Sequence, residues 1–290
     1  MPEDTPDGGL TALSRPEHGA LPVSWYDSLQ QLPAAATPCP YILAHEFFDA
    51  LPIHAFEATP AGWRELLVSP SPSPPRSPKE PDFVLSRADT PTRHSLLLPE
   101  LSPRYRALAS TPGAVVEISP DALAVAEEIA RRIGMPHAGA ALVVDYGPPA
   151  AVPANSLRGI RAHCRVSPLV DAGAVDLSAD VDFCALAERA LAASPHVEVH
   201  GPVAQGPFLL TMGMRERLAQ LTTTATTSAA VHAEIEAGSE NHRLRRWLKS
   251  GFRRLADTEP GAMGAVYKVL AVVPERDGKK PVGFGGAVYG

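Results

Sequence analysis

The chain has 290 residues, of which 45% are hydrophobic and 20% charged, so it can bury a sizeable core and is not wholly disordered. Its net charge of -6 argues against a general nucleic-acid binder, because binding to phosphates needs an excess of positive charge. No apolar run approaches the roughly 20 residues of a membrane helix, so no transmembrane segment is predicted. Three cysteines without a C-x-x-C pair favour a reducing compartment.

The N-terminal residues 1–22 contain few apolar positions and no period, so we expect a disordered leader there. Its first ten residues, MPEDTPDGGL, are acidic and rich in proline, unlike a secretory signal or a mitochondrial presequence. The sequence therefore predicts an ordered domain over residues 23–273, followed by a tail over residues 274–290.

A short apolar run at residues 41–44 precedes the polar sequence HEFFD, which predicts a buried strand that ends in a loop. Residues 53–57 and 63–69, separated by a Pro-Ala-Gly turn, predict an antiparallel pair. The proline- and serine-rich residues 69–81 predict a surface loop, because proline interrupts both ladders and helices. This loop is either an insertion in a hairpin or a docking site for proline-binding modules.

The strongest helix signal begins at Ser119, a capping residue followed by proline, an acid and a helical period of apolar residues that ends at Gly134. An apolar run at residues 140–144 follows and ends in Asp145 and Gly147. A helix that leads into a fully apolar strand is typical of a parallel sheet covered on both faces. The predicted fold class is therefore α/β.

Further elements follow in chain order. We expect helices over residues 181–192, 207–222 and 229–250, with weak helix-forming threonines at 221–228, and strands over residues 197–200 and 263–273. The basic segment RLRRWLKSGFRR, residues 243–254, has one apolar face at helical spacing. It is either a solvated helix packed by that face or a contact for anionic lipid or an acidic partner.

Acidic residues directly after apolar strands are the first candidates for a site, because ligands bind at the carboxyl ends of parallel strands. Glu46 and Asp49 follow the first strand, and Asp145 follows the later one. Each acid could instead cap a helix or simply end its strand. His45 and His54 lie near these acids, but the spacing matches no metal signature, so no metal site is predicted. No G-x-S-x-G motif or cysteine–histidine pair indicates a hydrolase.

Six ordered blocks resemble one family. They are HEFFDALPIHAFE (45–57), ALVVDYG (141–147), SLRGIRAH (156–163), DLSADVDF (176–183), GPVAQGPFLLTMGMRERL (201–218) and MGAVYKVLAVV (263–273). These blocks are similar to those of the arginine methyltransferases that help assemble mitochondrial complex I and of their bacterial MidA-type relatives. The resemblance extends over about residues 25–273.

The resemblance implies a class I methyltransferase sheet, Rossmann-like, with helices on both faces. Residues 41–44 and 142–144 would be its fourth and fifth strands, and residues 197–200 and 265–273 would form its antiparallel edge. It also implies S-adenosyl-L-methionine as methyl donor, symmetric dimethylation of an arginine in a complex I core subunit, and a location in the mitochondrial matrix.

By position in the family, Glu46 and Asp49 would lie beside the transferred methyl group, and Gln205 and Phe208 are candidates for the same cleft as Asp145. A carboxylate can hold a guanidinium group through two hydrogen bonds and accept its proton as the new bond forms. Asp180 stands where relatives more often carry histidine, so no role is assigned to it.

One family feature is missing. Relatives begin with a strand, a glycine-rich loop that approaches the cofactor and a second strand that ends in an acid, and neither strand precedes residue 41 here. No cofactor-binding residue is therefore assigned. The chain is expected to be an N-terminally truncated form of a working enzyme, a non-catalytic homologue that binds an assembly partner, or an unrelated fragment of the α/β hydrolase type. The oligomeric state is left open.

Overall fold

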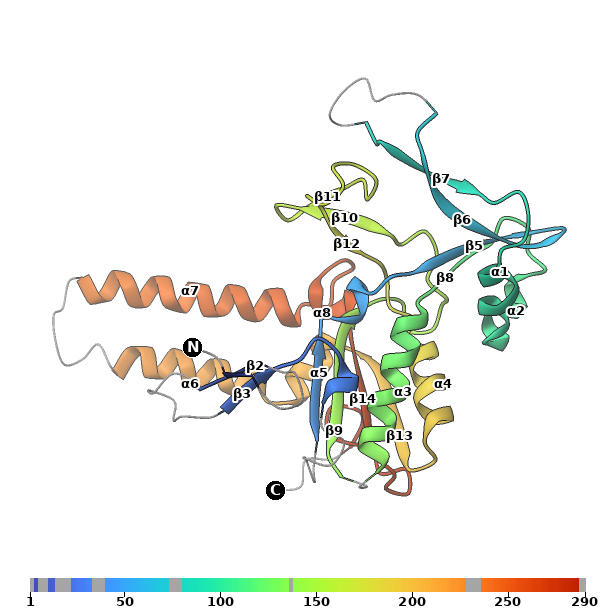
Figure 1. The fold of residues 1–290 in the computed structure, drawn as a ribbon. Helices are drawn as coiled ribbons and strands as arrows, with labels where there is room; N and C mark the ends of the chain where they lie inside the picture. Colours follow the sequence, from blue (N-terminus) through green and yellow to red (C-terminus); the bar gives the residue numbers. More distant parts are fainter. Residues whose placement is uncertain are drawn as a thin grey trace.

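The computed structural model describes residues 3–4, 10–13, 22–32, 40–72, 80–135, 138–227 and 236–286. In these ranges no helix is both long enough and apolar enough to cross a bilayer. These ranges contain two four-stranded sheets and two three-stranded antiparallel sheets (Figure 1).

The central sheet has the strand order β13-β14-β9-β4. Its strands are β4 (Tyr41–His45), β9 (Ala140–Tyr146), β13 (Val197–Ala204) and β14 (Tyr267–Pro274). β4 and β9 are parallel, whereas β14 runs antiparallel to both β9 and β13. This arrangement confirms the predicted fold class and the predicted antiparallel edge.

Helices α3 (Pro120–Gly134) and α4 (Phe183–Ala193) pack against each other and cover one face of this sheet (Figure 1). The predicted cap is confirmed, because the Ser119 side chain accepts the N–H of Ala122. On β14, Leu270 packs into the core beneath α3 and α4, and its neighbour Val269 is buried as well. Successive strand residues point to opposite faces, so both faces of the sheet are covered at β14.

The edge strand β4 is covered on one face only. Tyr41 and Leu43 are 80% and 68% exposed, whereas Ala44 is buried. The prediction of a buried strand at residues 41–44 is therefore wrong for these two side chains, because β4 lies at the edge of the sheet and pairs with β9 alone.

The second sheet has the order β7-β6-β5-β8 and extends away from the first. It consists of β5 (His54–Thr59), β6 (Gly62–Pro70), β7 (Phe83–Arg87) and β8 (Val115–Ile118). The predicted antiparallel pair is confirmed in β5 and β6. Pairing of β6 with β7 makes the proline-rich segment the connection of a hairpin, although residues 73–79 lie outside the described part. Two short helices, α1 (Arg93–Leu97) and α2 (Pro103–Leu108), were not predicted.

The smaller sheets also lay outside the predictions. One has the order β11-β10-β12, from β10 (Arg158–Arg161), β11 (Cys164–Val166) and β12 (Asp176–Ser178). The other joins β1 (Glu3–Asp4), β2 (Leu10–Leu13) and β3 (Pro22–Trp25). Its first two strands, β1 and β2, lie within residues 1–22, which were expected to be disordered. There β2 pairs with β3.

Two helix predictions differ from the structure in their bounds. The helix expected over residues 207–222 is broken into α5 (Gln205–Thr211) and α6 (Met214–Thr227), because Gly213 adopts a positive φ of 89°. The threonines do not interrupt α6. Thr222 and Thr223 lie inside this helix, and their hydroxyls donate to carbonyls one turn earlier. The next helix, α7 (Glu236–Ala256), runs beyond its predicted end.

The C-terminal part differs as well. The strand expected from residue 263 starts only at Tyr267, after the short helix α8 (Met263–Val266). The residues after β14 were expected to be a tail, yet the Phe284 ring lies 5.4 Å from that of Phe208. Gly283 lies against the same ring, and a Cβ added there would approach Phe208 to 2.5 Å. A larger residue at position 283 would require this segment or the Phe208 ring to shift.

Candidate functional site

Glu46 lies at the point where the chain leaves β4. Its backbone has a φ of 48°, in the left-handed region that few residues other than glycine adopt. Its N–H donates to the carbonyl of Val144 at 2.9 Å, which extends the parallel pairing by one residue. The side chain is 49% exposed, and the Tyr267 hydroxyl donates to its Oε1 at 2.9 Å. The strand end therefore presents a carboxylate with a fixed donor beside it.

Asp145 is fully buried beneath this turn. Its Oδ2 accepts the backbone N–H groups of Phe47, Phe48 and Asp49 at 3.2, 2.9 and 3.3 Å. Its Oδ1 accepts the N–H of Tyr146 at 2.9 Å. Burial, followed by the charge of Asp49, raises the pKa of Asp145 to about 7. This carboxyl group fixes the loop that carries the other two acids.

Asp49 is buried and faces the side of β9 that carries Tyr146. The Tyr146 hydroxyl donates to Asp49 Oδ2 in a short hydrogen bond and also lies 2.6 Å from the Ser178 hydroxyl. Burial, followed by the hydrogen bond to Asp49, raises the pKa of Tyr146, so the phenol stays protonated. Asp49 Oδ1 is buried without a hydrogen-bond partner among the described residues.

An open cleft extends from Glu46 across the ring of Tyr146. The Arg158 guanidinium lies over this ring, 4.5 Å from its centroid, and its Nη1 donates to Asp180 Oδ1 at 2.6 Å. Tyr267 closes the side next to Glu46, and burial followed by its hydrogen bond to Glu46 raises its pKa. The cleft is lined by Glu46, Tyr146, Ala154, Asn155, Ser156, Arg158, Ile160, Arg165, Asp180, Val266 and Tyr267.

The five predicted site residues are thus not equivalent. Glu46 opens to the cleft, whereas Asp49 lies behind it and reaches it through Tyr146. Asp145 was expected at the cleft but is buried, because the turn needs an acceptor for its N–H groups. Gln205 and Phe208 are also buried and do not line the cleft. Gln205 donates to the Leu255 carbonyl at 3.0 Å, and Phe208 packs against Phe284.

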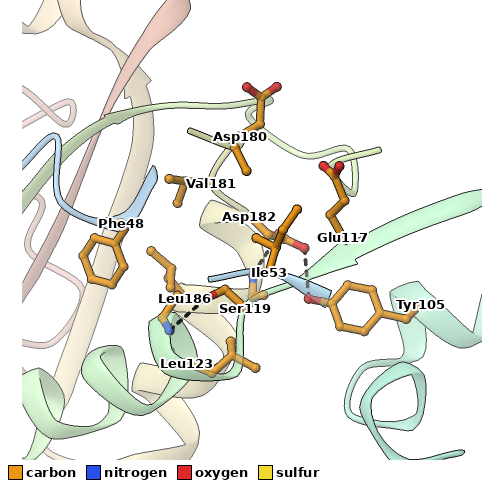
Figure 2. Close-up of a pocket in the computed structure, with 13 residues that line it drawn as sticks. Phe48, Ile53, Tyr105, Glu117, Ser119, Leu123, Asp180, Val181, Asp182 and Leu186 are labelled. Carbon is orange, nitrogen blue, oxygen red and sulfur yellow. Dashed lines mark hydrogen bonds between the residues drawn. The ribbon is translucent and has the colours of Figure 1, made fainter. Parts of the chain in front are cut away.

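A second, narrow gap lies between the two large sheets (Figure 2). Its polar groups are already paired within the protein. The Tyr105 hydroxyl donates to Asp182 at 3.1 Å, and Glu117 accepts the N–H of Ser156 at 3.0 Å. With its donors and acceptors satisfied, this gap is part of the packed interior between the sheets.

The cleft residues that were not predicted as site residues include Tyr146, Arg158 and Tyr267. All three lie inside the sequence blocks that carried the family resemblance. They come from three elements that are distant in sequence, β9, β10 and β14, so no local spacing joins them. The one sequence signal is a tyrosine at the carboxyl end of an apolar strand, next to Asp145.

Comparison with known proteins identifies the family. The model of a family of S-adenosyl-L-methionine-dependent methyltransferases matches residues 10–203. The chain belongs to this family. It is 38% identical to the rat mitochondrial protein arginine methyltransferase NDUFAF7 over 256 residues, which cover 88% of this chain and 50% of the rat protein. Identity to the human protein of the same name is 32% over 88% of this chain and 49% of that protein.

The chain spans about half the length of these curated relatives. Its fold also matches a crystal structure of a Burkholderia thailandensis protein bound to S-adenosyl-homocysteine, with a TM-score of 0.60 and 23% identity. That match covers 91% of this chain and 57% of the bacterial one. The methyltransferase family and the fold class predicted from the sequence are therefore confirmed.

Proposed function

We propose that this chain supplies the acceptor side of an S-adenosyl-L-methionine-dependent protein arginine methyltransferase. The observation that carries the proposal is the Glu46 carboxylate, which opens to the cleft at the end of β4 with Tyr267 as its donor. The names of the curated relatives support arginine as the methylated residue.

Glu46 would receive the guanidinium group of the substrate. A carboxylate attracts this planar cation and aligns one of its nitrogens through hydrogen bonds. Because the guanidinium pKa exceeds about 12, its proton is lost as the new bond forms. Glu46 would accept it, since the other acid that lines the cleft, Asp180, is paired with Arg158. Tyr267, whose pKa is raised, remains a hydrogen-bond donor and holds the carboxylate in place.

The remaining cleft residues hold other side chains in place and take no part in the chemical step. Asp49 fixes the Tyr146 ring through its hydroxyl, and this ring forms the floor beneath Arg158. Asp180 pairs with Arg158 at 2.6 Å, which reduces the repulsion between this arginine and a cationic substrate. Arg165 also lines the cleft, without an ion pair among the described residues. Of the two acids that line the cleft, Glu46 is the one that pairs with no arginine or lysine among the described residues.

The methyl donor, S-adenosyl-L-methionine, would deliver an electrophilic methyl group when bound. The described residues ahead of β4 contain no glycine-rich loop that leads into a helix. In the central sheet, β4 pairs with β9 alone. Side chains at the ends of β4 and β9 fit the acceptor, but they do not make a site for the nucleoside of the donor. We therefore assign no residue of this chain to the cofactor.

The location, the type of methylation and the protein substrate are inferred from the relatives. The name of the mammalian relatives places them in mitochondria, and the family resemblance adds symmetric dimethylation of a complex I core subunit in the matrix. A second candidate function follows because the described residues ahead of β4 contain no glycine-rich cofactor loop. In that case the chain is a non-catalytic homologue that binds an assembly partner through the same cleft.

Calorimetry with S-adenosyl-L-methionine and with an arginine-containing peptide, combined with mass spectrometry of that peptide, tests the proposal. Because no donor site is assigned to this chain, we expect no binding heat with S-adenosyl-L-methionine but saturable binding of the peptide, which Glu46→Gln should weaken at least about tenfold because the carboxylate that holds the guanidinium group is lost. Glu100→Gln, an exposed acid outside the cleft, is the matched control. Absence of peptide binding would favour the non-catalytic function, and unchanged peptide affinity in Glu46→Gln would remove Glu46 from the acceptor site. A dimethylated arginine in the mass spectrum would contradict the absence of a donor site in this chain.

A further inference from the structure

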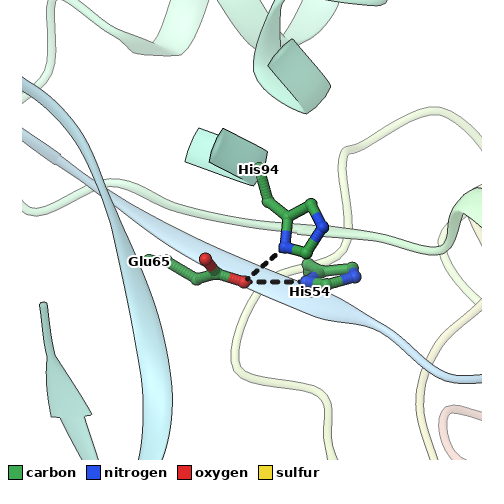
Figure 3. Close-up of side chains that lie close together, drawn as sticks. All are labelled: His54, Glu65 and His94. Carbon is green, nitrogen blue, oxygen red and sulfur yellow. Dashed lines mark hydrogen bonds and ion pairs between the residues drawn. The ribbon is translucent and has the colours of Figure 1, made fainter. Parts of the chain in front are cut away.

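A cluster of two histidines and a glutamate lies on the second sheet, away from the methyltransferase cleft (Figure 3). Glu65 Oε1 lies 2.7 Å from His54 Nδ1 and 3.4 Å from His94 Nδ1. Among the described residues, this is the one group of three metal-ligating side chains whose ligand atoms all lie within 4.8 Å of one another. We propose that His54, Glu65 and His94 bind one divalent transition-metal ion of the zinc type.

The fold brings these three residues together from separate elements. In the antiparallel pair of β5 and β6, Glu65 lies opposite Phe56, so His54 is its diagonal neighbour on the same face. His94 comes from the first turn of α1, which packs on β6. Because the three positions are far apart in sequence, their spacing forms no motif, and the metal prediction from sequence considered only His54 with residues 45–49.

The geometry is close to that of a metal site. Zinc ligands at about 2.0–2.1 Å in a tetrahedron are about 3.3 Å from one another. The distance of 3.4 Å between His94 and Glu65 matches this edge, and the 2.7 Å between His54 and Glu65 requires a shift of only about half an ångström. Both Nδ1 atoms point at the same carboxylate oxygen in Figure 3. A single ion between the three atoms would satisfy all of them.

The second oxygen of Glu65 is fixed by a separate partner. The Thr92 hydroxyl donates to Glu65 Oε2, while the same hydroxyl accepts the N–H of Ser95 at 3.0 Å. The hydroxyl proton is therefore committed to Glu65, and the carboxylate keeps Oε1 directed at the histidines. Supporting hydrogen bonds of this kind orient ligands in metal sites.

The ligand set and its exposure specify the ion. Two imidazoles and one carboxylate suit zinc, cobalt or nickel better than magnesium or calcium, which prefer oxygen ligands alone. Glu65 is 6% exposed in its side chain, but His54 and His94 are 29% and 51% exposed. The outer side of the site therefore faces solvent, and water would occupy the remaining position.

The bound ion would have a structural role. It would tie the first turn of α1 to the hairpin of β5 and β6, which otherwise contact each other through few buried side chains. No part in methyl transfer is assigned to it, since the cluster lies outside the cleft around Glu46. The alternative is a histidine–glutamate ion pair that binds no metal.

The test uses the full chain, stripped with a chelator and titrated with ZnCl2 by calorimetry and with Co²⁺ by visible absorption. We expect one ion per chain, a cobalt spectrum of tetrahedral type and a Tm that rises with zinc. His94→Ala, which removes a half-exposed side chain, and His54→Ala should each weaken binding at least about tenfold. Circular dichroism checks that both variants fold.

His163→Ala, which removes an exposed histidine elsewhere in the chain, should bind zinc like the unchanged chain and serves as the matched control. Two results would overturn the proposal. One is the absence of saturable binding, which would leave an ion pair only. The other is equal affinity in the double variant H54A/H94A, which would trace the binding to other histidines.

Discussion

Asp145 and Glu65 are both buried carboxylates that hold a segment of the chain in place, but their partners differ in kind. Asp145 accepts backbone N–H groups from the turn after β4. Glu65 is surrounded by side chains, two imidazoles and a hydroxyl. Backbone donors cannot release their protons, whereas imidazole nitrogens can exchange a proton for a metal ion. Asp145 therefore has a structural role only, whereas Glu65 can also serve as a metal ligand.

The two environments also move the pKa values in opposite directions. Burial and the charge of Asp49 raise the pKa of Asp145 to about 7, against the effect of its backbone donors. Burial opposes ionisation of Glu65 too, but hydrogen bonds from Thr92 and His54 and the charges of His54 and His94 outweigh it, so the pKa of Glu65 is lowered. A carboxylate in a low-polarity site is thus kept ionised by charged partners more effectively than by amide dipoles.

Replacing Asp145 by alanine should have the largest effect on stability. The N–H groups of residues 47–49 and 146 would lose their acceptor inside the protein, which costs about 3–4 kcal/mol in the free energy of unfolding. Urea denaturation followed by circular dichroism measures this loss. Asp145→Asn keeps one oxygen for the N–H groups of residues 47–49 and loses only the acceptor of the Tyr146 N–H, so it should lose less stability. Equal losses in the two variants would show that charge, and not hydrogen-bond acceptance, holds the turn.

The raised pKa of Asp145 makes stability depend on pH. Its value is 3.8 in the unfolded chain and about 7 in the folded one, so folding favours the protonated form. This stabilisation is fully present below pH 3.8 and is lost as the pH rises through 7. Between pH 5 and pH 8 the loss should be on the order of 2 kcal/mol. Denaturation across this range should give a steeper decline for the unchanged chain than for Asp145→Asn, and parallel curves would contradict the assignment.

Thr92 supports the second carboxylate and should have an intermediate effect. Thr92→Val removes the hydroxyl that donates to Glu65, so zinc affinity should fall about tenfold in calorimetry. The same change removes the N-cap of α1 and is expected to cost about 1 kcal/mol of stability. Thr92→Ser keeps the hydroxyl and is the control. If the serine variant binds zinc as weakly as the valine variant, the hydroxyl is not what orients Glu65.

Much of the central sheet could be predicted because its signals are local. The apolar run of β9 and the Ser119 cap of α3 each occupy one short stretch of sequence. The break between α5 and α6 depends on Gly213, and an isolated glycine in a helical pattern is often tolerated. The late start of β14 depends on α8, whose four residues are too few to show a period.

The site was predictable only in part, for a related reason. Glu46 could be found because it directly follows an apolar strand whose carboxyl end faces a crevice. The burial of Asp145 could not, because it depends on how the turn after β4 directs its N–H groups. Glu65 and His94 become neighbours only through the packing of α1 on β6, which no sequence spacing encodes.

The smallest effect on stability is expected for Glu46→Gln, which sharpens the contrast with Asp145. The Glu46 side chain is half exposed and accepts one described hydrogen bond, from Tyr267, which a glutamine oxygen can also accept. The free energy of unfolding should therefore change by no more than about 0.5 kcal/mol. A change above about 2 kcal/mol in the free energy of unfolding, measured by urea denaturation, would show that Glu46 stabilises the turn after β4 as Asp145 does. Its left-handed backbone would then serve the fold and not the cleft, since unusual backbone geometry is retained either for packing or for function.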